Sequence, residues 1–508
     1  MSLRITASML YDLVSCPHRV TMDIFADSAE RDASNEFVKL LWERGVIHEK
    51  ETIDRLGVPF TDLSRYSDDE KEQLTLEAIQ RGDLLIYSAR IQADGLLGEP
   101  DLLRKEGDGY IAVDIKSGMG EEGPEDLPEP KKHYAVQLGL YIDILERKNL
   151  SAGRRAFIWD INGKEAIYDF TELYGKRNLH TLWQDYQDCL AEAKAIVEQS
   201  TETLAAYSSA CKHCHWYSAC ISHLSDTSDL TLIPELGRSK RDVLMNRVKT
   251  IQELADADPS DFLEGKKTIF PGIGPTTLKK LHARARLISI GEKAKPYLRE
   301  SVTLPVADLE LYFDVETDPI QDICYLHGFV ERRGGDNNSE RFVSFFAEEP
   351  TAEAEEQAFA DAWRYIQESR PCVIYYYSKY ERTVFRKLRD KYPDVCTENE
   401  MEALFDPELA IDLYYDVVHK ATEWPTRDFS IKTLAKYLGF DWRDSHPSGA
   451  ASIEWFHRWT ETRDTTIRQR ILDYNEDDCR AMRVLRDAIG GFPLLPEGAV
   501  LPITSLPR

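Results

Sequence analysis

The spacing of hydrophobic and polar positions changes repeatedly along the chain, which predicts a mixed α/β protein. In the first part, apolar residues recur at helical spacing and give way to short runs rich in Val, Ile, Leu and Tyr that are typical of strands. Helical patterns cover residues 36–56, 68–81, 132–148 and 176–200, and strand-like runs cover residues 84–91, 98–103, 110–116 and 155–170.

A second set of patterns begins after the polar stretch at 225–229. Residues 235–300 have the pattern of short helices interrupted by the sequence F-P-G-I-G-P. Beyond Pro305, strand-like runs cover 309–316 and 373–377, and helical patterns cover 352–368, 380–391, 430–438 and 464–488. The patterns therefore predict three domains, residues 1–225, 235–300 and 305–492, a number that the length of 508 residues favours.

Composition narrows the class of protein. No apolar run approaches the roughly 18 residues that a membrane helix needs, and the amino terminus lacks the pattern of a secretory signal. We therefore expect a cytoplasmic protein without membrane contact, whose nine cysteines stay reduced. The net charge of −26 argues against general coating of nucleic acid, but residues 266–299 carry nine Lys or Arg and a single acid.

Two acids and a lysine lie on or beside neighbouring strand-like runs. The pattern is Pro-Asp101, then twelve residues, then Asp114-Ile-Lys116. Because side chains alternate along a strand, Asp114 and Lys116 share one face. Two converging carboxylates can hold Mg²⁺ or Mn²⁺, and a lysine beside them can orient water and offset charge that develops on a phosphate. This combination indicates phosphodiester hydrolysis.

Further motifs surround this pattern. Gly45-x-x-His48 lies upstream in a helical pattern, and Gln137 and Tyr141 lie downstream at i, i+4 on one helical face. In this order the motifs resemble the RecB-type branch of the PD-(D/E)xK nucleases, which implies a restriction-endonuclease-like fold for residues 1–225. The resemblance also implies a metal-dependent catalytic site made of His48, Asp101, Asp114 and Lys116, with Gln137 and Tyr141 as a supporting motif.

The sequence C-K-H-C-H-W-Y-S-A-C at 211–220 carries three cysteines within ten residues. With His223 it forms C-x2-C-x5-C-x2-H, which has enough nitrogen and sulfur ligands for a tetrahedral zinc site. The short central gap argues against zinc, since paired zinc ligands are usually separated by about 12 or more residues. Reduced cysteines that bind no metal are a further alternative.

Cys16 is a fourth candidate ligand, far upstream. One cysteine before a RecB-like core and C-x2-C-x5-C after it resembles the iron–sulfur nucleases, which include the helicase-nuclease subunit AddB and CRISPR-associated nucleases. The resemblance implies a structural 4Fe–4S cluster that ties together the two ends of the nuclease domain. Its ligands would be Cys16, Cys211, Cys214 and Cys220, and the histidines at 213, 215 and 223 would be neighbours. We favour this cluster over zinc.

Residues 270–281, F-P-G-I-G-P-T-T-L-K-K-L, place a glycine-rich turn directly before a helix. Backbone N–H groups and the helix dipole at such a position favour an anion. The segment resembles the helix-hairpin-helix module, which binds DNA phosphates without reading sequence. The resemblance implies nucleic-acid contacts by Gly272, Gly274, Lys279 and Lys280. An ordinary helix cap and a packing element between larger domains are the alternatives.

A second set of acids lies in the last third of the chain. Asp314 and Glu316 share one face of a strand, and Tyr474 and Asp478 are i, i+4 neighbours in a helical pattern. Carboxylates from several elements can hold two cations, beside which a tyrosine hydroxyl can position water. These motifs resemble the DEDDy 3′–5′ exonucleases of the ribonuclease H-like fold, and residues 430–440, S-I-K-T-L-A-K-Y-L-G-F, resemble a further segment of those domains.

The fourth acid departs from that family's pattern. Where the family has N-x-x-x-D, this chain has Tyr377-S-K-Y-Glu381, so glutamate replaces aspartate and tyrosine replaces asparagine. The longer side chain of Glu381 can reach the metals from a displaced backbone. Asp412, in A-I-D-L-Y, is the rival for the same role.

The order of the parts resembles a bacterial family in which a RecB-like nuclease precedes a C-terminal YprB-like ribonuclease H domain. We expect a metal-dependent nuclease that acts on DNA, single-stranded or at duplex ends, in repair, recombination or phage defence. The sequence contains no phosphate loop of the form G-x-x-x-x-G-K-S/T, so we expect any helicase to be a separate partner. RNA as the substrate, and a nucleic-acid-binding scaffold with inactive sites, are the alternatives.

Overall fold

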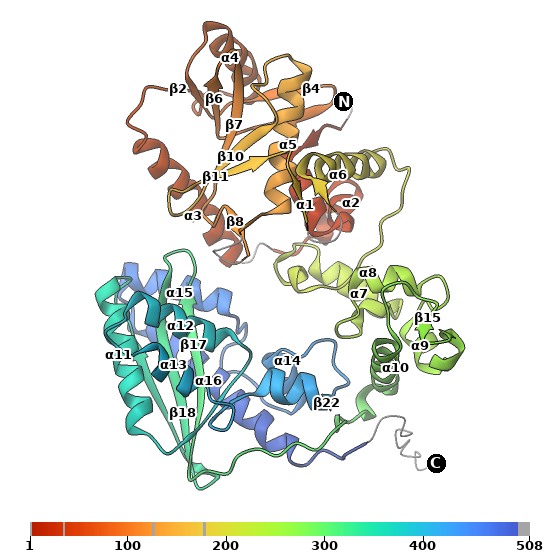
Figure 1. The fold of residues 1–508 in the computed structure, drawn as a ribbon, viewed down its shortest axis with the longest axis vertical. Coiled ribbons are helices and arrows are strands. Elements are labelled where there is room, and N and C mark those ends of the chain that lie inside the picture. Colours follow the sequence, from red (N-terminus) through yellow and green to blue (C-terminus); the bar gives the residue numbers. More distant parts are fainter. Residues whose placement is uncertain (1–2, 34–35, 124–127, 176–178, 496–508) are drawn as a thin grey trace. The chain divides into compact units, whose positions relative to one another are not determined.

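The computed structural model describes residues 3–33, 36–123, 128–175 and 179–495. The chain divides into two compact units, Met1–Ile221 and Ser222–Arg508 (Figure 1). No helix within the described ranges is both long and apolar enough to cross a bilayer. Both units contain helices and sheets, which confirms the predicted mixed α/β class.

The first unit is built on a mixed six-stranded sheet. The central strand β7 (Gly109–Ile115) pairs antiparallel with β6 and parallel with β10, and all of its residues are buried. This burial explains its continuous apolar run. The strand order is β11 (Glu165–Asp169), β10 (Arg155–Trp159), β7, β6 (Leu102–Glu106), β3 (Leu85–Tyr87) and β2 (Thr61–Asp62). A separate three-stranded sheet contains β1 (Ile5–Thr6), β5 (Leu96–Gly98) and β4 (Ile91–Ala93).

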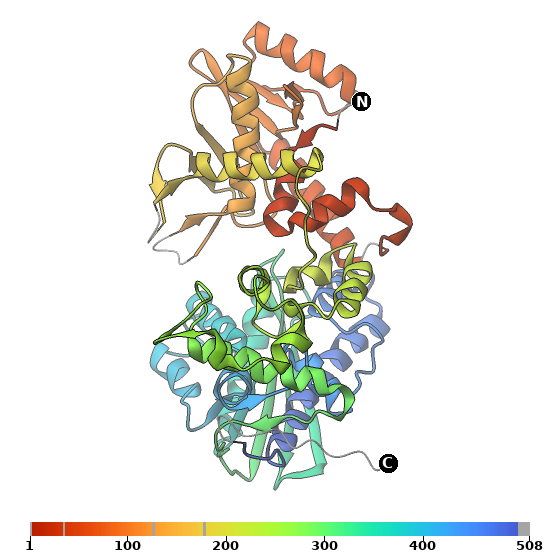
Figure 2. The same cartoon turned by 90° about the vertical axis from the view of Figure 1, so that its right-hand side faces the viewer.

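Alternation along β7 sends its side chains into two cores. Tyr110 and Ala112 belong to the core that also contains residues of α1 (Ala7–Ser15), α5 (Lys132–Arg147) and α6 (Leu182–Val197). Ile111, Val113 and Ile115 pack on the other face with Ile53 of α3 (Glu36–Asp54). Asp114 therefore faces α5, which α6 crosses (Figure 2).

Two predicted strands are wrong in extent. Residues 84–91 form β3 and β4, which lie in different sheets, because the chain turns at Ser88 with φ of 57°. Residues 98–103 are likewise divided between β5 and β6, with Pro100 in the intervening turn. The helix predicted over 176–200 is α6, and residues 176–178 lie outside the described part of the chain.

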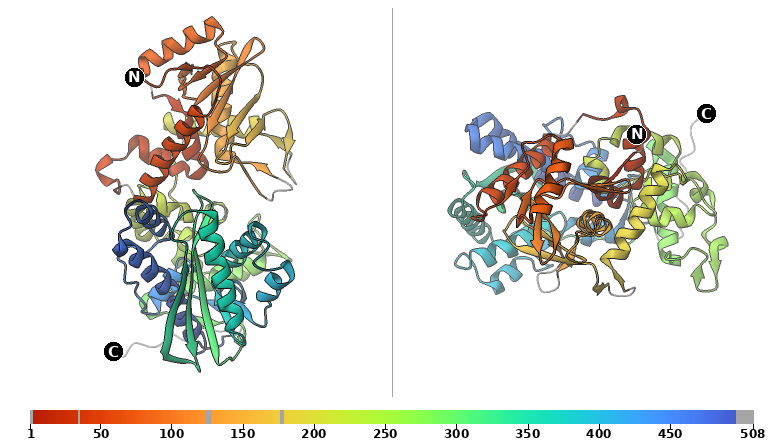
Figure 3. Two further views of the ribbon diagram at one scale, coloured as in Figure 1. Left: turned by 90° about the vertical axis from the view of Figure 1, so that its left-hand side faces the viewer. Right: turned by 90° about the horizontal axis from the view of Figure 1, so that it is seen from above.

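The second unit is built on a five-stranded sheet. Three long antiparallel strands, β17, β18 and β19, lie on one side, and the short β20 and β21 run parallel to β17 (Figure 3). The strand order is β19 (Asp336–Phe346), β18 (Ile323–Arg333), β17 (Leu309–Asp318), β20 (Val373–Tyr376) and β21 (Ala410–Asp412).

Helices cover both faces of this sheet. Leu311 and Phe313 of β17 pack with Phe359 of α11 (Ala352–Glu368) and Phe385 of α12 (Tyr380–Lys391). The even-numbered residues of β17 face the other way, since Tyr312 packs in the core that includes residues of α14 (Ile431–Tyr437) and α16 (Thr465–Ile489). Alternation therefore points Asp314 and Glu316 toward α16.

Residues 222–300 belong to the same compact unit. They form α8 (Gly237–Leu244), α9 (Ile251–Asp256) and α10 (Pro275–Ile290) around a small apolar core of their own. β16 (Tyr297–Leu298) pairs with β22 (Thr422–Glu423), and Arg284 of α10 forms a buried ion pair with Glu423 at 2.8 Å. These contacts join the helical segment to the five-stranded part. The boundary between the predicted second and third domains stays a prediction.

Candidate active sites

The first candidate site lies where β6 begins and β7 ends. The amide of Ile115 donates to Oδ2 of Asp101 at 2.7 Å, and the amide of Asp101 lies 3.4 Å from Oδ1 of Asp114. Nζ of Lys116 is 2.9 Å from Oδ2 of Asp114. Antiparallel pairing of β6 with β7 brings these residues together.

Electrostatics at this site favour a bound cation. Burial raises the pKa of Asp101 well above its usual value, and the Asp114 charge raises it further. Burial by itself lowers the pKa of Lys116, but the carboxylates of Asp114 and Asp101 outweigh this effect and raise that pKa. Lys116 therefore stays an ammonium at neutral pH, and a divalent cation would compete with the proton that Asp101 takes up.

Helix α5 carries the two supporting residues. The hydroxyl of Tyr141 donates to the carbonyl oxygen of Glu99 at 3.3 Å, and the pKa of Tyr141 is raised first by burial and then by the two aspartates. Gln137, one turn earlier, has a buried Oε1 without a hydrogen-bond partner among the described residues. Gly98 permits the close approach of α5, because a Cβ there would lie 2.6 Å from Cδ1 of Tyr141.

His48 lies on α3, which passes the end of β7: a Cβ on Gly45 would lie 3.9 Å from Oγ of Ser117. Nε2 of His48 is buried and has no hydrogen-bond partner within the described ranges, which suits a metal ligand. The ligand atoms of His48, Asp101 and Asp114 do not all lie within 4.8 Å of one another.

Glu49 is a residue of this site that sequence analysis missed. After burial and Asp114, its charge is a further cause of the raised pKa of Asp101. Its Oε1 accepts a hydrogen bond from the hydroxyl of Tyr87 at 2.9 Å. The only signal in the sequence is its position directly after His48, and a surface helix carries many such acids.

The four cysteines of the predicted metal centre come together in the first unit. Burial raises the pKa of Cys220 to about 12, and the charges of Cys214, Cys16 and Cys211 follow as causes. No three of the Sγ atoms lie within 4.8 Å of one another. Thiolates bound to a single zinc ion lie at most about 4.6 Å apart, because each Zn–S bond is about 2.3 Å. The spacing is therefore wider than one zinc ion requires.

Polar contacts join the segment after Cys16 to the segment 211–220, which carries the other three cysteines. Asp23 of α2 (Pro17–Phe25) accepts a hydrogen bond from Nε1 of Trp216 at 3.0 Å and lies 2.6 Å from Nε2 of His215. The amide of Asp32 donates to the carbonyl oxygen of His215 at 2.8 Å. His215 is thus engaged with Asp23, and His223 is exposed on α7 (Tyr217–Asp226). This arrangement favours the thiols as ligands.

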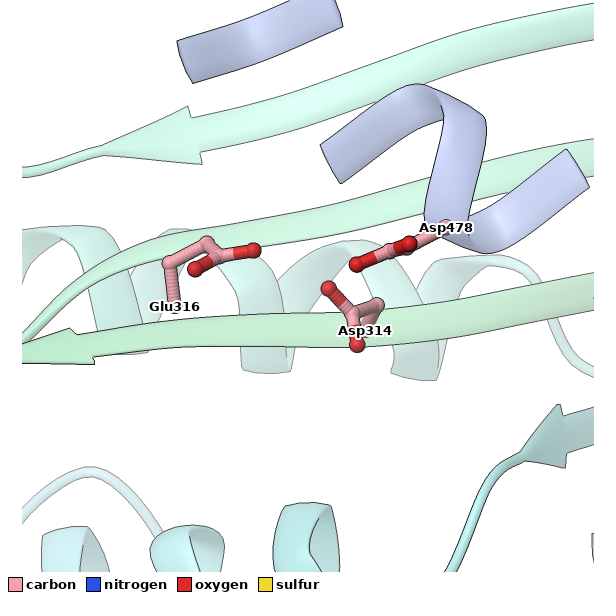
Figure 4. A group of neighbouring side chains, drawn as sticks. All are labelled: Asp314, Glu316 and Asp478. Atoms are coloured by element: carbon pink, nitrogen blue, oxygen red, sulfur yellow. The ribbon is translucent and has the colours of Figure 1, made fainter. Parts of the chain in front are cut away.

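The second candidate site is formed by three carboxylates of the second unit. Asp314 and Glu316 point from β17 toward Asp478 on α16 (Figure 4). One ligand oxygen of each lies within 4.8 Å of the others, and no other group of three potential ligands meets this criterion in the described part of the chain. The structure therefore brings together the acids of the two sequence motifs in an arrangement that suits divalent cations.

The pKa values of two acids of this carboxylate triad, Asp314 and Glu316, are strongly raised. Burial raises the pKa of Asp314 well above its usual value, followed by the charges of Asp478 and Glu316. Burial also raises the pKa of Glu316 to about 8, with Asp478 as the next cause and Lys432 opposing it. Buried acids at this spacing need positive charge to stay ionised, as is common at functional sites.

Lys432 provides a cation and was missed in the sequence, although it lies in the 430–440 run. It lies in the first turn of α14, and its Nζ is 3.2 Å from Oδ2 of Asp478 and donates to the hydroxyl of Tyr474 at 2.8 Å. Burial, and then the charges of the triad, raise the pKa of Tyr474, so its hydroxyl stays protonated. Nε1 of Trp442 donates to Oδ1 of Asp478 at 2.8 Å.

The two candidates for the fourth acid differ in their contacts. Glu381 is buried, its Oε2 has no partner among the described residues, and its charge is a further cause of the raised pKa of Asp314 after burial, Asp478 and Glu316. Oδ1 of Asp412 instead accepts three backbone N–H groups at 3.0 Å, from Ser378, Tyr414 and Tyr415. The contacts favour Glu381 as the ligand and a structural role for Asp412.

Some features of the glycine-rich turn and of α10 suit phosphate binding, and others do not. Gly272 has φ of 77°, Gly274 caps the start of α10, and both are surrounded by open space. Lys279 is exposed, but Nζ of Lys280 lies 3.2 Å from Oε2 of Glu235, which Arg284 also approaches at 2.9 Å. Part of the basic excess of α10 therefore serves internal ion pairs. The helix-hairpin-helix assignment stays a prediction.

Comparison with known families agrees with the two sites. Residues 21–221 match the family model of the PD-(D/E)XK nuclease superfamily, and residues 311–489 match that of the RNase_H superfamily. A search of curated proteins finds no match. The chain therefore contains a PD-(D/E)XK nuclease domain and a C-terminal ribonuclease H-like domain, which confirms the two larger predicted folds. Two domains of nuclease superfamilies support a metal-dependent nuclease that binds nucleic acid.

Proposed function

We propose that this protein hydrolyses DNA at two separate metal-dependent sites, one of the RecB-like PD-(D/E)xK type and one 3′–5′ exonuclease site of the DEDDy type. The observation that supports this most strongly is the approach of Asp314, Glu316 and Asp478 to within 4.8 Å, inside the span that matches the RNase_H superfamily. Buried carboxylates at such spacing are costly unless cations compensate them, and oxygen ligands suit Mg²⁺ or Mn²⁺.

At the second site, cations held by Asp314, Glu316, Asp478 and Glu381 would activate water and stabilise the charge on the scissile phosphate. Tyr474 orients the attacking water through its protonated hydroxyl, which Lys432 holds at 2.8 Å. Asn475 orients the Asp314 carboxylate through a hydrogen bond of 2.7 Å from Nδ2 to Oδ2. Groups fixed in this way before the substrate binds need little reorganisation during the reaction.

At the first site, a cation held by Asp101, Asp114 and His48 would supply the nucleophilic water. Lys116, whose Nζ lies 2.9 Å from Oδ2 of Asp114, would supply a positive charge for the phosphate there. Gln137 and Tyr141 offer hydrogen-bonding groups from α5 beside the two acids.

We assign Cys16, Cys211, Cys214 and Cys220 as ligands of a structural 4Fe–4S cluster, with zinc as the alternative. Thiols spaced more widely than one zinc ion requires support the cluster, whose ligands bind different iron atoms. Anaerobic purification tests the assignment: brown protein with about four irons supports the cluster, and colourless protein with one zinc overturns it. Cys16→Ser should lower the iron content in the same preparation.

Separate substitutions test the two hydrolytic sites. Asp114→Ala and Asp314→Ala should each remove one metal-dependent activity on end-labelled DNA, while Asp416→Ala, at an exposed acid, should change neither. Cleavage assays with matched DNA and RNA substrates, both single-stranded and duplex, show which polymer the protein hydrolyses. If neither active-site substitution changes cleavage of any nucleic acid, the two-site nuclease is wrong. Binding without cleavage would indicate a scaffold that recruits a helicase. Within the cell we expect the enzyme to act in repair, recombination or phage defence.

A further inference from the structure

The five-stranded sheet of the second unit has a bulge beside the carboxylate triad. Glu316 of β17 is paired with Leu326 of β18, whereas the next residue, Thr317, is paired with Cys324. Tyr325 lies between these pairs and has no partner on β17. Tyr325 and Leu326 pack in the same core, although consecutive side chains of a regular strand point to opposite faces. The bulge therefore turns Tyr325 toward the face of the sheet on which Glu316 lies.

The hydroxyl of Tyr325 connects Glu316 to helix α15 (Gly449–Thr462). It donates to Oε2 of Glu316 at 3.4 Å and lies 2.7 Å from Oγ of Ser452 on α15. The side chains of Tyr325 and Ser452 are fully buried. Burial, and then the Glu316 charge, raise the pKa of Tyr325 well above its usual value, so its hydroxyl stays protonated and remains a donor. Burial is the largest cause of the raised pKa of Glu316, and a hydrogen bond from Ser452 is among the influences that lower it.

Two further contacts fix α15 against the sheet. The ring of Phe456 stacks on the ring of Tyr325 with their centroids 4.1 Å apart. Nε2 of His457 lies 2.8 Å from Oδ2 of Asp318, the last residue of β17, and both side chains are buried. A stacked ring and a helix anchored at the end of β17 leave the hydroxyls of Tyr325 and Ser452 little freedom to move away from the triad.

We propose that Tyr325 and Ser452 are positioning residues, which orient the carboxylate of Glu316 for a divalent cation at the triad. This inference rests on the proposed exonuclease site and adds to it two residues that lie outside its sequence motifs. Hydrogen bonds to a carboxylate ligand fix its orientation, and loss of such a partner typically lowers metal affinity or activity by about 10- to 100-fold. Hydroxyl groups suit this role, because a neutral donor leaves the charge of the carboxylate available to the cation.

Metal binding tests the positioning role without hydrolysis. In an Asp114→Ala background, which disables the first site, calorimetric titration with Mn²⁺ should show an affinity about 10- to 100-fold lower for Tyr325→Phe and for Ser452→Ala. Tyr325→Phe keeps the stacked ring and removes only the hydroxyl. Tyr365→Phe is the matched control, because the hydroxyl that it removes donates to a glutamate outside the triad at 2.8 Å. The control should bind Mn²⁺ as tightly as its parent.

Recovery at high metal concentration gives a second readout that a structural role alone would not change. At low Mn²⁺, Tyr325→Phe should shorten 3′ ends more slowly than the wild type, because less of the enzyme has metal at the triad. Raising the Mn²⁺ concentration should restore much of the rate. A rate that stays low at saturating Mn²⁺, with unchanged Mn²⁺ affinity, would contradict the positioning role.

The outcomes separate this inference from the proposed function. Mn²⁺ affinities within about twofold of the parent for both variants would overturn the positioning role, even if the wild type shortens DNA. Mn²⁺ binding that Asp314→Ala does not reduce would overturn the metal site of the triad and this inference with it. A wild type that binds Mn²⁺ at the triad but shortens no nucleic acid would overturn the exonuclease, and the titrations would still decide the positioning role. Thermal melting identifies a variant that fails to fold, in which case the other variant decides.

Discussion

The side chain of Asn475 occupies the space that any side chain on Gly328 would fill. Nδ2 of Asn475 donates to Oδ2 of Asp314 at 2.7 Å, and its Oδ1 lies 1.6 Å from the position of a Cβ on Gly328. A glycine in the middle of β18 therefore allows α16 to approach the sheet closely. This approach places both Asn475 and Asp478 against the acids of β17.

Gly328→Ala should consequently impair the second site. The added methyl group must displace Asn475, which removes the hydrogen bond to Asp314 and strains the packing of α16. We expect the free energy of unfolding to fall by about 1–3 kcal/mol and 3′-end shortening to fall at least tenfold. Urea unfolding and an end-labelled DNA assay measure the two effects. Gly449→Ala is the control, because open space surrounds that glycine; equal behaviour of the two variants would contradict the prediction.

Lys432 should matter for the reaction more than for substrate binding. Lys432→Met keeps the aliphatic stem but removes the cation that holds the Tyr474 hydroxyl and offsets the Asp478 charge. We expect kcat for 3′-end shortening to fall about a hundredfold with a smaller change in KM. Lys436→Met, at an exposed position of the same helix, should be neutral. A lower affinity with unchanged kcat would show that Lys432 only binds substrate.

The acids of the second site should make the metal-free protein sensitive to alkaline pH. The pKa of Glu316 rises from 4.5 to about 8 in the folded protein, chiefly through burial. The folded chain then holds this proton more tightly than the unfolded chain, so the associated stability is fully present below about pH 4.5 and is lost as the pH rises through 8. Melting temperatures in EDTA should fall between about pH 5 and 8 and level off above that, and they should fall less in Glu316→Gln.

Binding of a divalent metal should depend on pH in the opposite direction to the stability of the metal-free protein. Mn²⁺ competes with the proton on the triad, so its affinity should increase as the pH rises toward 8. Calorimetric titrations in buffers with different ionisation enthalpies should show proton release near pH 7. If Mn²⁺ binding to Glu316→Gln releases as many protons as binding to the wild type, the proton that the metal displaces belongs to a group other than Glu316.

The regular repeats of strands and helices explain which pairs of site residues could be recognised in the sequence. Asp114 and Lys116, like Asp314 and Glu316, share a face because strands alternate, and Tyr474 and Asp478 share a face because helices repeat. Such pairs are visible without a structure. Cys16 and Cys211 were linked only through a family pattern, and the structure now places both in one group of thiols.

Tertiary packing explains what the sequence could not show. Lys432 and Asp478 are 46 residues apart and meet because α14 packs against α16. Asn475 lies inside a run of polar residues, and its contact with Asp314 spans 161 positions. Lys280 was expected to contact phosphate because its segment resembles a helix-hairpin-helix module, but its ion-pair partner Glu235 comes from a turn 45 residues away in the sequence. A pattern of residue types along one element contains no information about such partners.

The ion pair between Arg284 and Glu423 should make the helical segment and the ribonuclease H-like domain unfold together. Their side chains are 1% and 0% exposed, and Nε of Arg284 lies 2.8 Å from Oε2 of Glu423. Arg284→Met would leave the buried carboxylate of Glu423 with the partly exposed Arg299, at 3.2 Å, as its ion-pair partner, and should lower the free energy of unfolding by at most about 3–5 kcal/mol. Arg284→Met combined with Glu423→Gln should recover part of that loss, because the buried carboxylate is replaced by a neutral amide and Arg299, which is partly exposed, can be solvated. Urea unfolding of the full chain measures both, with Arg286→Met on the same helix as the control. A double variant as unstable as Arg284→Met would show that α10 is held by the other contacts of Arg284, such as its hydrogen bond to the carbonyl oxygen of Pro234.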